Sequence, residues 1–297
     1  MFEFKDAKTF SENFLDHLWD RISGVAGNST VGDEQAGKLY ADEGLVAFHG
    51  DMPVGALLWK LVTPADRSSG SFIGASLGVV PELRGRGLGS LLASQLKLII
   101  EKNPYINTSI QAEDSDPVAN YLASKLQLRA RFKRLRYQLT LTQRLELPNH
   151  TYRIAIYDGQ ERKVVEEVAA LYARAFRGQD SVGDLTPERF HDFSTQSSSV
   201  LLCLWDADRL AAFAGLNQHD SEGWIYWIAA GRRWWGKGVS DVLSSVIHNQ
   251  LMDMGCTTAD AQADENNYPS RALMERFGMT PIKTYVMYGS DVVRPVG

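Results

Sequence analysis

The amino-acid sequence contains an internal repeat, in which residues of the first half recur 151 positions later in the second half. From Gly85 to Tyr137 the two halves align without a gap. Because one constant offset spans apolar runs, glycines and polar positions, we infer two copies of one fold. The expected domains are residues 1–143 and residues 150–297, joined by a linker that contains Pro148. The matching positions are Val31-Gly32-Asp33 with Val182-Gly183-Asp184, Gly85 and Gly87 with Gly236 and Gly238, Gln111-Ala112 with Gln262-Ala263, Leu122 with Leu273, and Tyr137 with Tyr288.

Hydrophobic periodicity predicts nearly the same order of elements in both copies, with a hairpin first and strands joined through helices later. We therefore expect an α+β protein, with a mixed and mostly antiparallel sheet flanked by helices. The strand at residues 131–140 is expected to close the sheet of the first copy. The first copy is expected to have strands at 2–5, 45–49, 54–62, 72–80, 105–113 and 131–140, and helices at 7–24, 33–42, 89–102 and 117–126. The second copy is expected to have strands at 152–157, 200–205, 209–216, 224–230, 258–262 and 283–288, and helices at 164–176, 239–254 and 268–277.

A glycine-rich stretch, residues 79–90, lies between an apolar run and a helical pattern. Such a loop can turn backbone N–H groups toward one point at a helix N-terminus, where the helix dipole attracts phosphate. Arg84 and Arg86 add positive charge. The stretch lacks the lysine of nucleoside-triphosphate loops, and its G-x-G-x-G spacing differs from the dinucleotide fingerprint. From these letters alone, a glycine turn without a ligand stays an open alternative.

Arg84, Gly87 and Gly89 match the Q/R-x-x-G-x-G/A signature of the GCN5-related N-acetyltransferase (GNAT) family, and the stretch resembles that family's acyl-CoA pyrophosphate loop. The order of elements resembles the same fold in both copies. The resemblance implies two tandem GNAT folds, acetyl-CoA as co-substrate and transfer of an acetyl group to an amine. The cofactor-binding residues that it implies are Val79, Val80, Arg84, Gly85, Arg86, Gly87, Leu88, Gly89, Ser90 and Asp116.

The two copies depart from the family pattern in different places. In the second loop, Trp235 stands at the Gln/Arg position and Ser240 at the last small position, so we interpret this loop as degenerate. The second copy keeps the family's cofactor-contacting asparagine, as Asn267. In many members a tyrosine on the next helix protonates the departing CoA thiolate, and here Ala123 and Met274 occupy its place.

The chemistry that the resemblance implies is direct attack of an amine on the thioester in a ternary complex. This reaction needs a backbone N–H near Val79 or Val80 to polarise the carbonyl, a base and a proton donor. Glu113 at a strand end is the candidate base, and Tyr121 is the phenol nearest to the missing acid; a solvated strand end is the alternative role for Glu113. Two further functions stay open: a non-catalytic acyl-CoA-binding or sensor protein, or catalysis by the C-terminal copy.

Composition limits which binding partners and which cellular compartment we expect. The net charge of −5 gives no basic surface for nucleic acid and leans toward cationic amines as acceptors. We expect a small-molecule amine rather than a protein, with a protein N-terminus or lysine left open as the acceptor. No apolar run approaches membrane-spanning length, and the N-terminus has no apolar signal core. Cys203 and Cys256 lack disulfide or metal-binding spacing and are expected to be inert thiols, which favours the cytoplasm. The six histidines show no ligand spacing, so no metal is expected.

Overall fold

The computed structural model describes residues 2–23, 43–62, 72–102, 107–177 and 185–290 of the chain, which forms two compact units of mixed α+β structure. The first unit consists of residues 1–63, 70–133 and 284–297, and the second of residues 64–69 and 134–283. The helix predicted at residues 33–42 lies outside the described residues.

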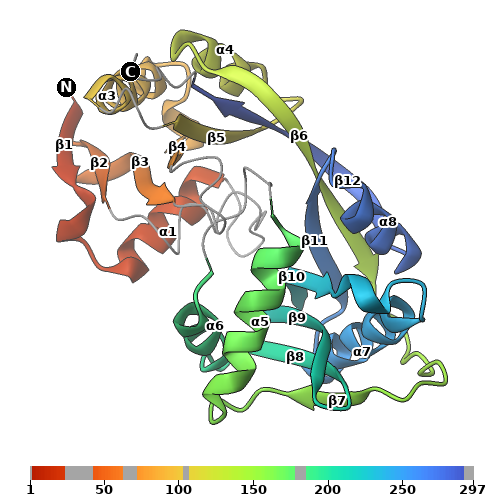
Figure 1. Ribbon diagram of the computed structural model, residues 1–297. Helices are drawn as coiled ribbons and strands as arrows, with labels where there is room; N and C mark the ends of the chain where they lie inside the picture. Colours follow the sequence, from red (N-terminus) through yellow and green to blue (C-terminus); the bar gives the residue numbers. More distant parts are fainter. Residues whose placement is uncertain (1, 24–42, 63–71, 103–106, 178–184, 291–297) are drawn as a thin grey trace, which may run out of the picture. The chain divides into compact units, whose positions relative to one another are not determined.

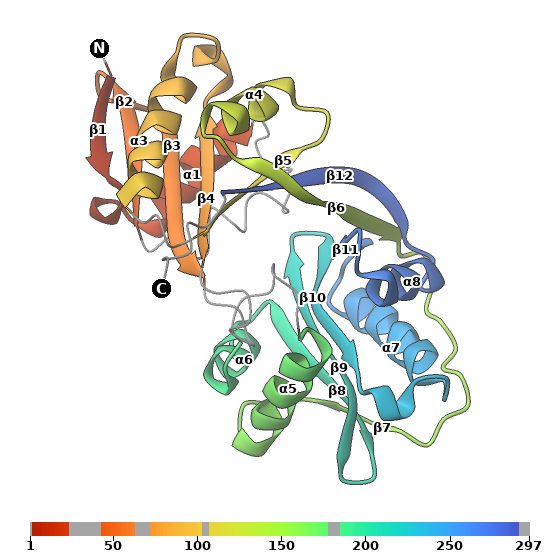
Figure 2. The ribbon, with the colours of Figure 1, turned by 45° about the horizontal axis from the view of Figure 1, so that its top comes forward.

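The sheet of the first unit has the strand order β1-β2-β3-β4-β5-β12, in which β4 and β5 are parallel and the other neighbours antiparallel. Gly55 faces α3, whereas Gly78 on the opposite face meets α1, and a Cβ on Gly78 would lie 2.2 Å from Ile22 Cγ2. The two helices therefore cover opposite faces of β3 and β4 (Figure 2). The elements are β1 Phe2–Asp6, the 3-10 helix η1 Ala7–Thr9, α1 Glu12–Ser23, β2 Glu43–His49, β3 Met52–Val62, β4 Phe72–Val79, η2 Pro81–Leu83, α3 Leu88–Lys102, β5 Asn107–Glu113, α4 Pro117–Lys125 and β12 Thr280–Gly289.

The sheet of the second unit has the strand order β7-β8-β9-β10-β11-β6, again with one parallel pair, β10 and β11. One face packs against α5 and α6, and the other packs against α7 and α8 (Figure 1). The elements are β6 Arg129–Thr140, β7 Arg153–Ile156, α5 Arg162–Ala175, α6 Pro187–Ser194, β8 Ser199–Asp206, β9 Arg209–His219, β10 Glu222–Ala230, η3 Arg232–Trp234, α7 Val239–Asp253, β11 Thr258–Asp264 and α8 Tyr268–Arg276.

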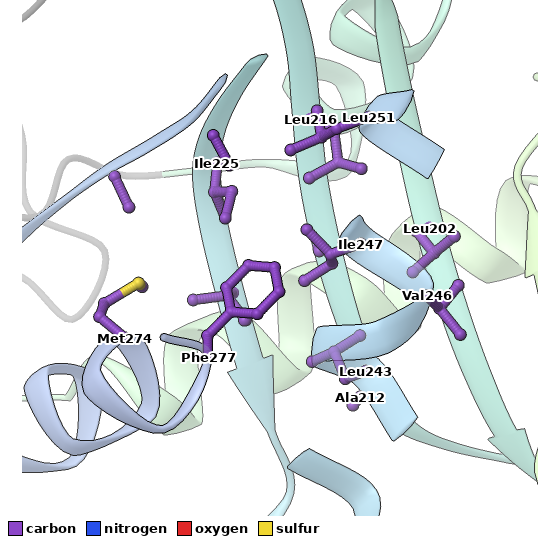
Figure 3. Close-up of a cluster of buried hydrophobic side chains, with 14 of the residues drawn as sticks. Leu202, Ala212, Leu216, Ile225, Leu243, Val246, Ile247, Leu251, Met274 and Phe277 are labelled. Carbon is purple, nitrogen blue, oxygen red and sulfur yellow. The ribbon is translucent and has the colours of Figure 1, made fainter. Parts of the chain in front are cut away.

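The core beneath α7 explains why that helix forms where the periodicity predicts it. Its buried side chains recur at helical spacing and pack onto the apolar faces of β8, β9 and β10 (Figure 3). Phe277, which follows α8, closes the same core. The labelled α7 residues of this cluster are Leu243, Val246, Ile247 and Leu251, and the strand residues are Leu202, Ala212, Leu216 and Ile225.

The last strand of each copy pairs within the other copy's sheet, so the expectation that residues 131–140 close the first sheet is wrong. β6 pairs antiparallel with β11, in a register that places Arg134 opposite Asp264. β12 pairs antiparallel with β5, in a register that places Tyr285 opposite Glu113 (Figure 1). Each expected domain, residues 1–143 or residues 150–297, contains one copy of the repeat. Each compact unit instead includes most of the last strand of the other copy.

Charge complementarity gives a physical reason for the exchange. Arg136 on β6 is 4% exposed, and its Nε lies 2.8 Å from the buried carboxylate of Asp260 on β11. At the position that matches Asp260, the first copy has Ser109 on β5. If β6 closed its own sheet, Arg136 would lose its carboxylate partner in a buried environment, which is strongly unfavourable.

The linker between the copies is fixed to α7. The N–H and C=O groups of Leu145 bond to the side-chain amide of Asn249, at 2.8 and 2.9 Å. A ring nitrogen of His248 lies 2.9 Å from the carbonyl oxygen of Gln143. These bonds hold residues 143–145 along the helix that follows the second glycine loop.

Most predicted elements are present within a few residues of their expected ends, and α6 is the described α-helix that the periodicity did not predict. Its start carries a recognisable signal, because the Thr186 hydroxyl accepts a hydrogen bond from the Arg189 N–H and Pro187 occupies the first turn. The shortness of the helix, eight residues, hid its periodicity.

Because β6 of the first copy pairs with β11 of the second, we predict that a fragment of the second copy folds only when it includes β6. We expect residues 129–290, which include β6, to unfold cooperatively with heat, and residues 150–290 to lack a cooperative transition, because the open edge of β11 and the Asp260 carboxylate lose their partners. Circular dichroism and calorimetry would measure both. A cooperative, monomeric 150–290 fragment would contradict the exchange.

Candidate functional site

The first glycine loop joins η2 to α3 through a backbone that glycine alone adopts easily. Gly85 and Gly87 have φ of +75° and +85°, in the left-handed region. A Cβ at either position would meet no atom within 4 Å, so the backbone there borders open space. The loop therefore exposes its main chain at the start of α3.

The first turn of α3 presents amide groups to that space. The N–H of Leu91 donates to the Gly87 carbonyl at 3.1 Å and begins the helical bonding pattern. In the part of the chain that the structure describes, the amides of Leu88, Gly89 and Ser90 have no hydrogen-bond acceptor. Unpaired amides at the positive end of a helix dipole attract anions such as phosphate.

Arg84 holds the loop with its side chain. Its Nε donates to the Val79 carbonyl at 3.1 Å, and its Nη2 donates to the Ile22 carbonyl on α1 at 2.6 Å. Its backbone N–H donates to the Pro81 carbonyl. Both arginines are exposed, but Nε and Nη2 of Arg84 are bound to protein carbonyls. Of the two arginines, Arg86 has the charge available to a ligand.

The two valines before the loop differ in where their backbone groups point. The Val80 N–H donates to the Val54 carbonyl on β3 at 3.0 Å. Because successive residues of a strand direct their backbone groups to opposite sides, the Val79 N–H points away from β3, toward the β5 side. The pairing of β4 with β5 covers only Phe72–Gly74 with Asn107–Ser109, so Val79 lies beyond it. Val79 is the better candidate to polarise a carbonyl.

The predicted catalytic and capping residues lie around the end of β5. Glu113 is half-buried, and its Oε1 accepts a hydrogen bond from Ser115 Oγ at 3.0 Å. Asp116 caps α4, with Oδ1 accepting from the amides of Val118 and Ala119. Tyr121 is 54% exposed and lies beside Lys125, so the structure does not bring it to Glu113.

The second loop has the same backbone as the first, held by a different side chain. Gly236 and Gly238 have φ of +73° and +75°. Trp235, at the position of Arg84, donates from Nε1 to the Ala230 carbonyl at 3.0 Å, just as Arg84 donates to the matching Val79 carbonyl. Trp234 is buried in the core and bonds Asp206. The substitutions that suggest degeneracy thus leave the loop conformation intact.

The strand before the second loop has a feature that the first lacks. The register of β10 against β9 shifts between Ile225 and Trp227, which marks a β-bulge at Tyr226. The pairing of β4 with β3 runs without a shift over its whole recorded length. The sequence contains no signal for this bulge that we recognised.

Ionisable groups differ between the units as well. Asp264, at the position of Glu113, forms a 2.6 Å ion pair with Arg134, and both side chains are mostly buried. Burial raises the pKa of Glu222, and the nearby Asp260 charge raises it further, against the opposing effect of Arg136. Burial also raises the pKa of the Cys203 thiol to about 12 and that of Cys256 to about 11, so both stay protonated at neutral pH and are poor nucleophiles.

Among the described residues, no group of three or more His, Cys, Asp or Glu side chains is placed to hold a metal ion. No helix in the described ranges is both long and apolar enough to cross a membrane.

The side-chain bonds of Arg84 predict a role in stability. We expect Arg84→Ala to lower the free energy of unfolding by about 1–2 kcal/mol, because two carbonyls lose a charged donor. Arg86→Ala is the matched control and should change it by less than about 0.5 kcal/mol. Urea denaturation of the full chain measures both, and equal effects would show that Arg84 does not hold the loop.

Comparison with known proteins finds a family match for part of the chain. The sequence model of the Acetyltransferase (GNAT) family matches residues 165–279, which span the second loop, α7 and β11. The curated protein sequences include no significant match to the chain.

Several solved structures share the fold over nearly the whole chain. A tandem GNAT protein from the clavulanic acid biosynthesis pathway has a TM-score of 0.76 at 14% identity, covering 99% of both chains. A GCN5-related N-acetyltransferase from Sphaerobacter thermophilus has a TM-score of 0.70 at 16% identity, covering 99% of this chain and 97% of its own. N-myristoyltransferase from Saccharomyces cerevisiae, with bound myristoyl-CoA, has a TM-score of 0.66 at 14% identity, covering 97% and 78%. Residues 165–279 thus match the GNAT family, and the likeness over the whole chain shows that the chain has the fold of these tandem GNAT structures.

Proposed function

We propose that this protein is an N-acetyltransferase, which transfers an acetyl group from acetyl-CoA to an amine by direct attack in a ternary complex. The family match supports acyl transfer from a CoA thioester in general. The observation that carries the proposal is the first loop, where two glycines of positive φ border open space beside α3 amides that donate to no acceptor among the described residues. This arrangement suits a pyrophosphate.

We assign the cofactor site to the first unit. The amides from Gly85 to Ser90 and the charge of Arg86 would hold the pyrophosphate, with Arg84 keeping the loop in place. Asp116 would contact the cofactor arm through the carboxylate oxygen that does not cap α4. The Val79 N–H would polarise the thioester carbonyl, and hydrogen bonds to a developing oxyanion lower the barrier to acyl transfer.

Glu113 is our candidate for the general base. The amine nitrogen forms the new C–N bond, the C–S bond breaks, and the surplus proton of the amine leaves through the Glu113 carboxylate to water. The matching carboxylate of the second unit, Asp264, is held in an ion pair by Arg134. Tyr121 is exposed on α4, which gives it little support as the proton donor.

The acceptor that we propose is a small amine. The net charge of −5 favours a cationic acceptor by a weak margin. Nothing in the described residues limits the acyl group to acetyl, so longer CoA thioesters belong in the same assay as competitors.

A second candidate is catalysis, or cofactor binding alone, in the C-terminal copy. Two observations favour it: the β-bulge at Tyr226, and the match of the family model to residues 165–279. The conformation of the second loop is also compatible with a bound anion. A protein that binds acetyl-CoA without transferring the acetyl group would be a sensor of the same fold.

Matched glycine variants separate the two units. We expect Gly87→Trp to abolish acetyl-CoA binding in isothermal titration and Gly238→Trp to leave it, because an indole at the first position would occupy the space beside the α3 amides. Both positions have positive φ and open surroundings, so the backbone strain should be similar. If only Gly238→Trp abolished binding, the cofactor site would lie in the second unit. If the unchanged protein bound two molecules of acetyl-CoA and each variant bound one, both units would have a site.

Matched carboxylate variants test the base. We expect Glu113→Gln to lower kcat about 100-fold while leaving KM for acetyl-CoA within about threefold, since an amide cannot accept the proton. Asp264→Asn should lower kcat far less. Thiol release, detected with an amine panel as acceptors, measures both rates. Equal rates for Glu113→Gln and the unchanged protein would remove Glu113 from the mechanism.

A further inference from the structure

We propose that Tyr288, on the last strand of the second copy, donates the proton to the departing CoA thiolate in the first unit. This inference rests on the proposed function. It assigns the donor to a residue brought in by the strand exchange, in place of a residue on α4.

The exchange places one tyrosine at the same position of both units. Tyr288 on β12 lies opposite Ile110 of β5, and Tyr137 on β6 lies opposite Ala261 of β11. Each phenol reaches the first turn of a helix in its own unit, α4 for Tyr288 and α8 for Tyr137. The Tyr288 hydroxyl donates to Asn120 Oδ1 on α4, and the Tyr137 hydroxyl accepts from Nε of Arg271, the matching residue of α8, at 3.3 Å.

Tyr288 lies beside the place where β5 parts from β4. The last recorded β4–β5 pair is Gly74 with Ser109, and Ile110, the next residue of β5, is the cross-strand partner of Tyr288. Side chains opposite one another in antiparallel strands lie about 5 Å apart at Cβ. β5 therefore lies between Tyr288 and β4, and Tyr288 is level with the start of the unpaired stretch of β4 that ends in Val79.

The phenol also lies on the face of the sheet that α3 covers. The Tyr288 hydroxyl bonds Asn120 on α4, and α4 packs against α3. A CoA thioester held by the first turn of α3 and by the Val79 N–H would run along this face. The sulfur atom would then lie on the same side as the Tyr288 hydroxyl.

The two tyrosines differ in their freedom to give up a proton. Tyr137 is completely buried, and its hydroxyl is held between Arg271 and the Glu275 carboxylate, to which it donates at 3.5 Å. Tyr288 is partly exposed, and its recorded partner is the neutral Asn120 side chain. The second unit thus has the same phenol in a closed setting.

The protonation state suits a donor. Burial raises the pKa of Tyr288, with a further increase from Asp114 and an opposing effect of Lys133. The phenol is therefore protonated at neutral pH. When the C–S bond breaks, its electron pair stays on sulfur, which takes the proton from Tyr288 Oη, and water returns a proton to the phenolate.

The test compares Tyr288→Phe with Tyr137→Phe in the full chain, because both variants keep the ring and remove the hydroxyl. We expect Tyr288→Phe to lower kcat about 100-fold, to leave the Kd of acetyl-CoA within about twofold, and to remove the fall of kcat at high pH. Tyr137→Phe should keep kcat within about threefold and retain that fall. An unchanged kcat in Tyr288→Phe would overturn the inference and leave the proposed function intact.

A second readout needs no turnover. Bound CoA is titrated with pH, and ionisation of its thiol is followed by the ultraviolet absorbance of the thiolate. A hydrogen bond from Tyr288 stabilises the thiolate, so Tyr288→Phe should move the titration to higher pH and Tyr137→Phe should not. If CoA binds and the Tyr288→Phe titration matches the unchanged protein, the phenol does not lie against the sulfur. If neither CoA nor acetyl-CoA binds, the proposed function fails, and the inference fails with it.

Discussion

The ion pair between Arg136 and Asp260 is the interaction on which the rest of the structure depends. The two side chains are 4% and 0% exposed, and Nε lies 2.8 Å from Oδ1. Removing one partner of a buried pair costs about 3–5 kcal/mol, which is a large share of the stability of a protein of ordinary size. The first copy has Ser109 in place of this aspartate, so β6 satisfies its arginine by pairing with β11. β12 then supplies the missing edge of β5, and each unit is completed by the other copy.

The two glycine loops show that one backbone can be held by different side chains. Arg84 in the first loop and Trp235 in the second both donate a hydrogen bond to the carbonyl of the last strand residue, Val79 or Ala230. A guanidinium and an indole share a planar N–H donor, which is what the loop requires of this position. Identity at the signature position is thus a poor measure of whether the loop keeps its shape. The positive φ values of the glycines are the more direct measure.

The units differ in the side chains that surround matching groups. Asp264 and Tyr137 of the second unit are engaged by Arg134, Arg271 and Glu275. Each such ion pair or charged hydrogen bond must be broken before the group can accept or donate a proton. In the first unit, Glu113 accepts a hydrogen bond from Ser115 and Tyr288 donates one to Asn120, while the charges of Asp114 and Lys133 also act on Tyr288. The second unit also has a β-bulge at Tyr226, whereas the pairing of β4 with β3 in the first unit runs without a shift.

Sequence reasoning alone determined the repeat, the α+β class, the position of nearly every described element and the glycine loops, because these depend on local periodicity and on the conformational freedom of glycine. It missed α6, which is short, and it closed the first sheet with the wrong strand. Tertiary structure decided which strand pairs with which, what Arg84 and Trp235 bond, and which tyrosine reaches α4. Strand partners separated by more than a hundred residues are chosen by buried charge and packing at contacts such as Arg136–Asp260, and no local pattern in the sequence records those contacts.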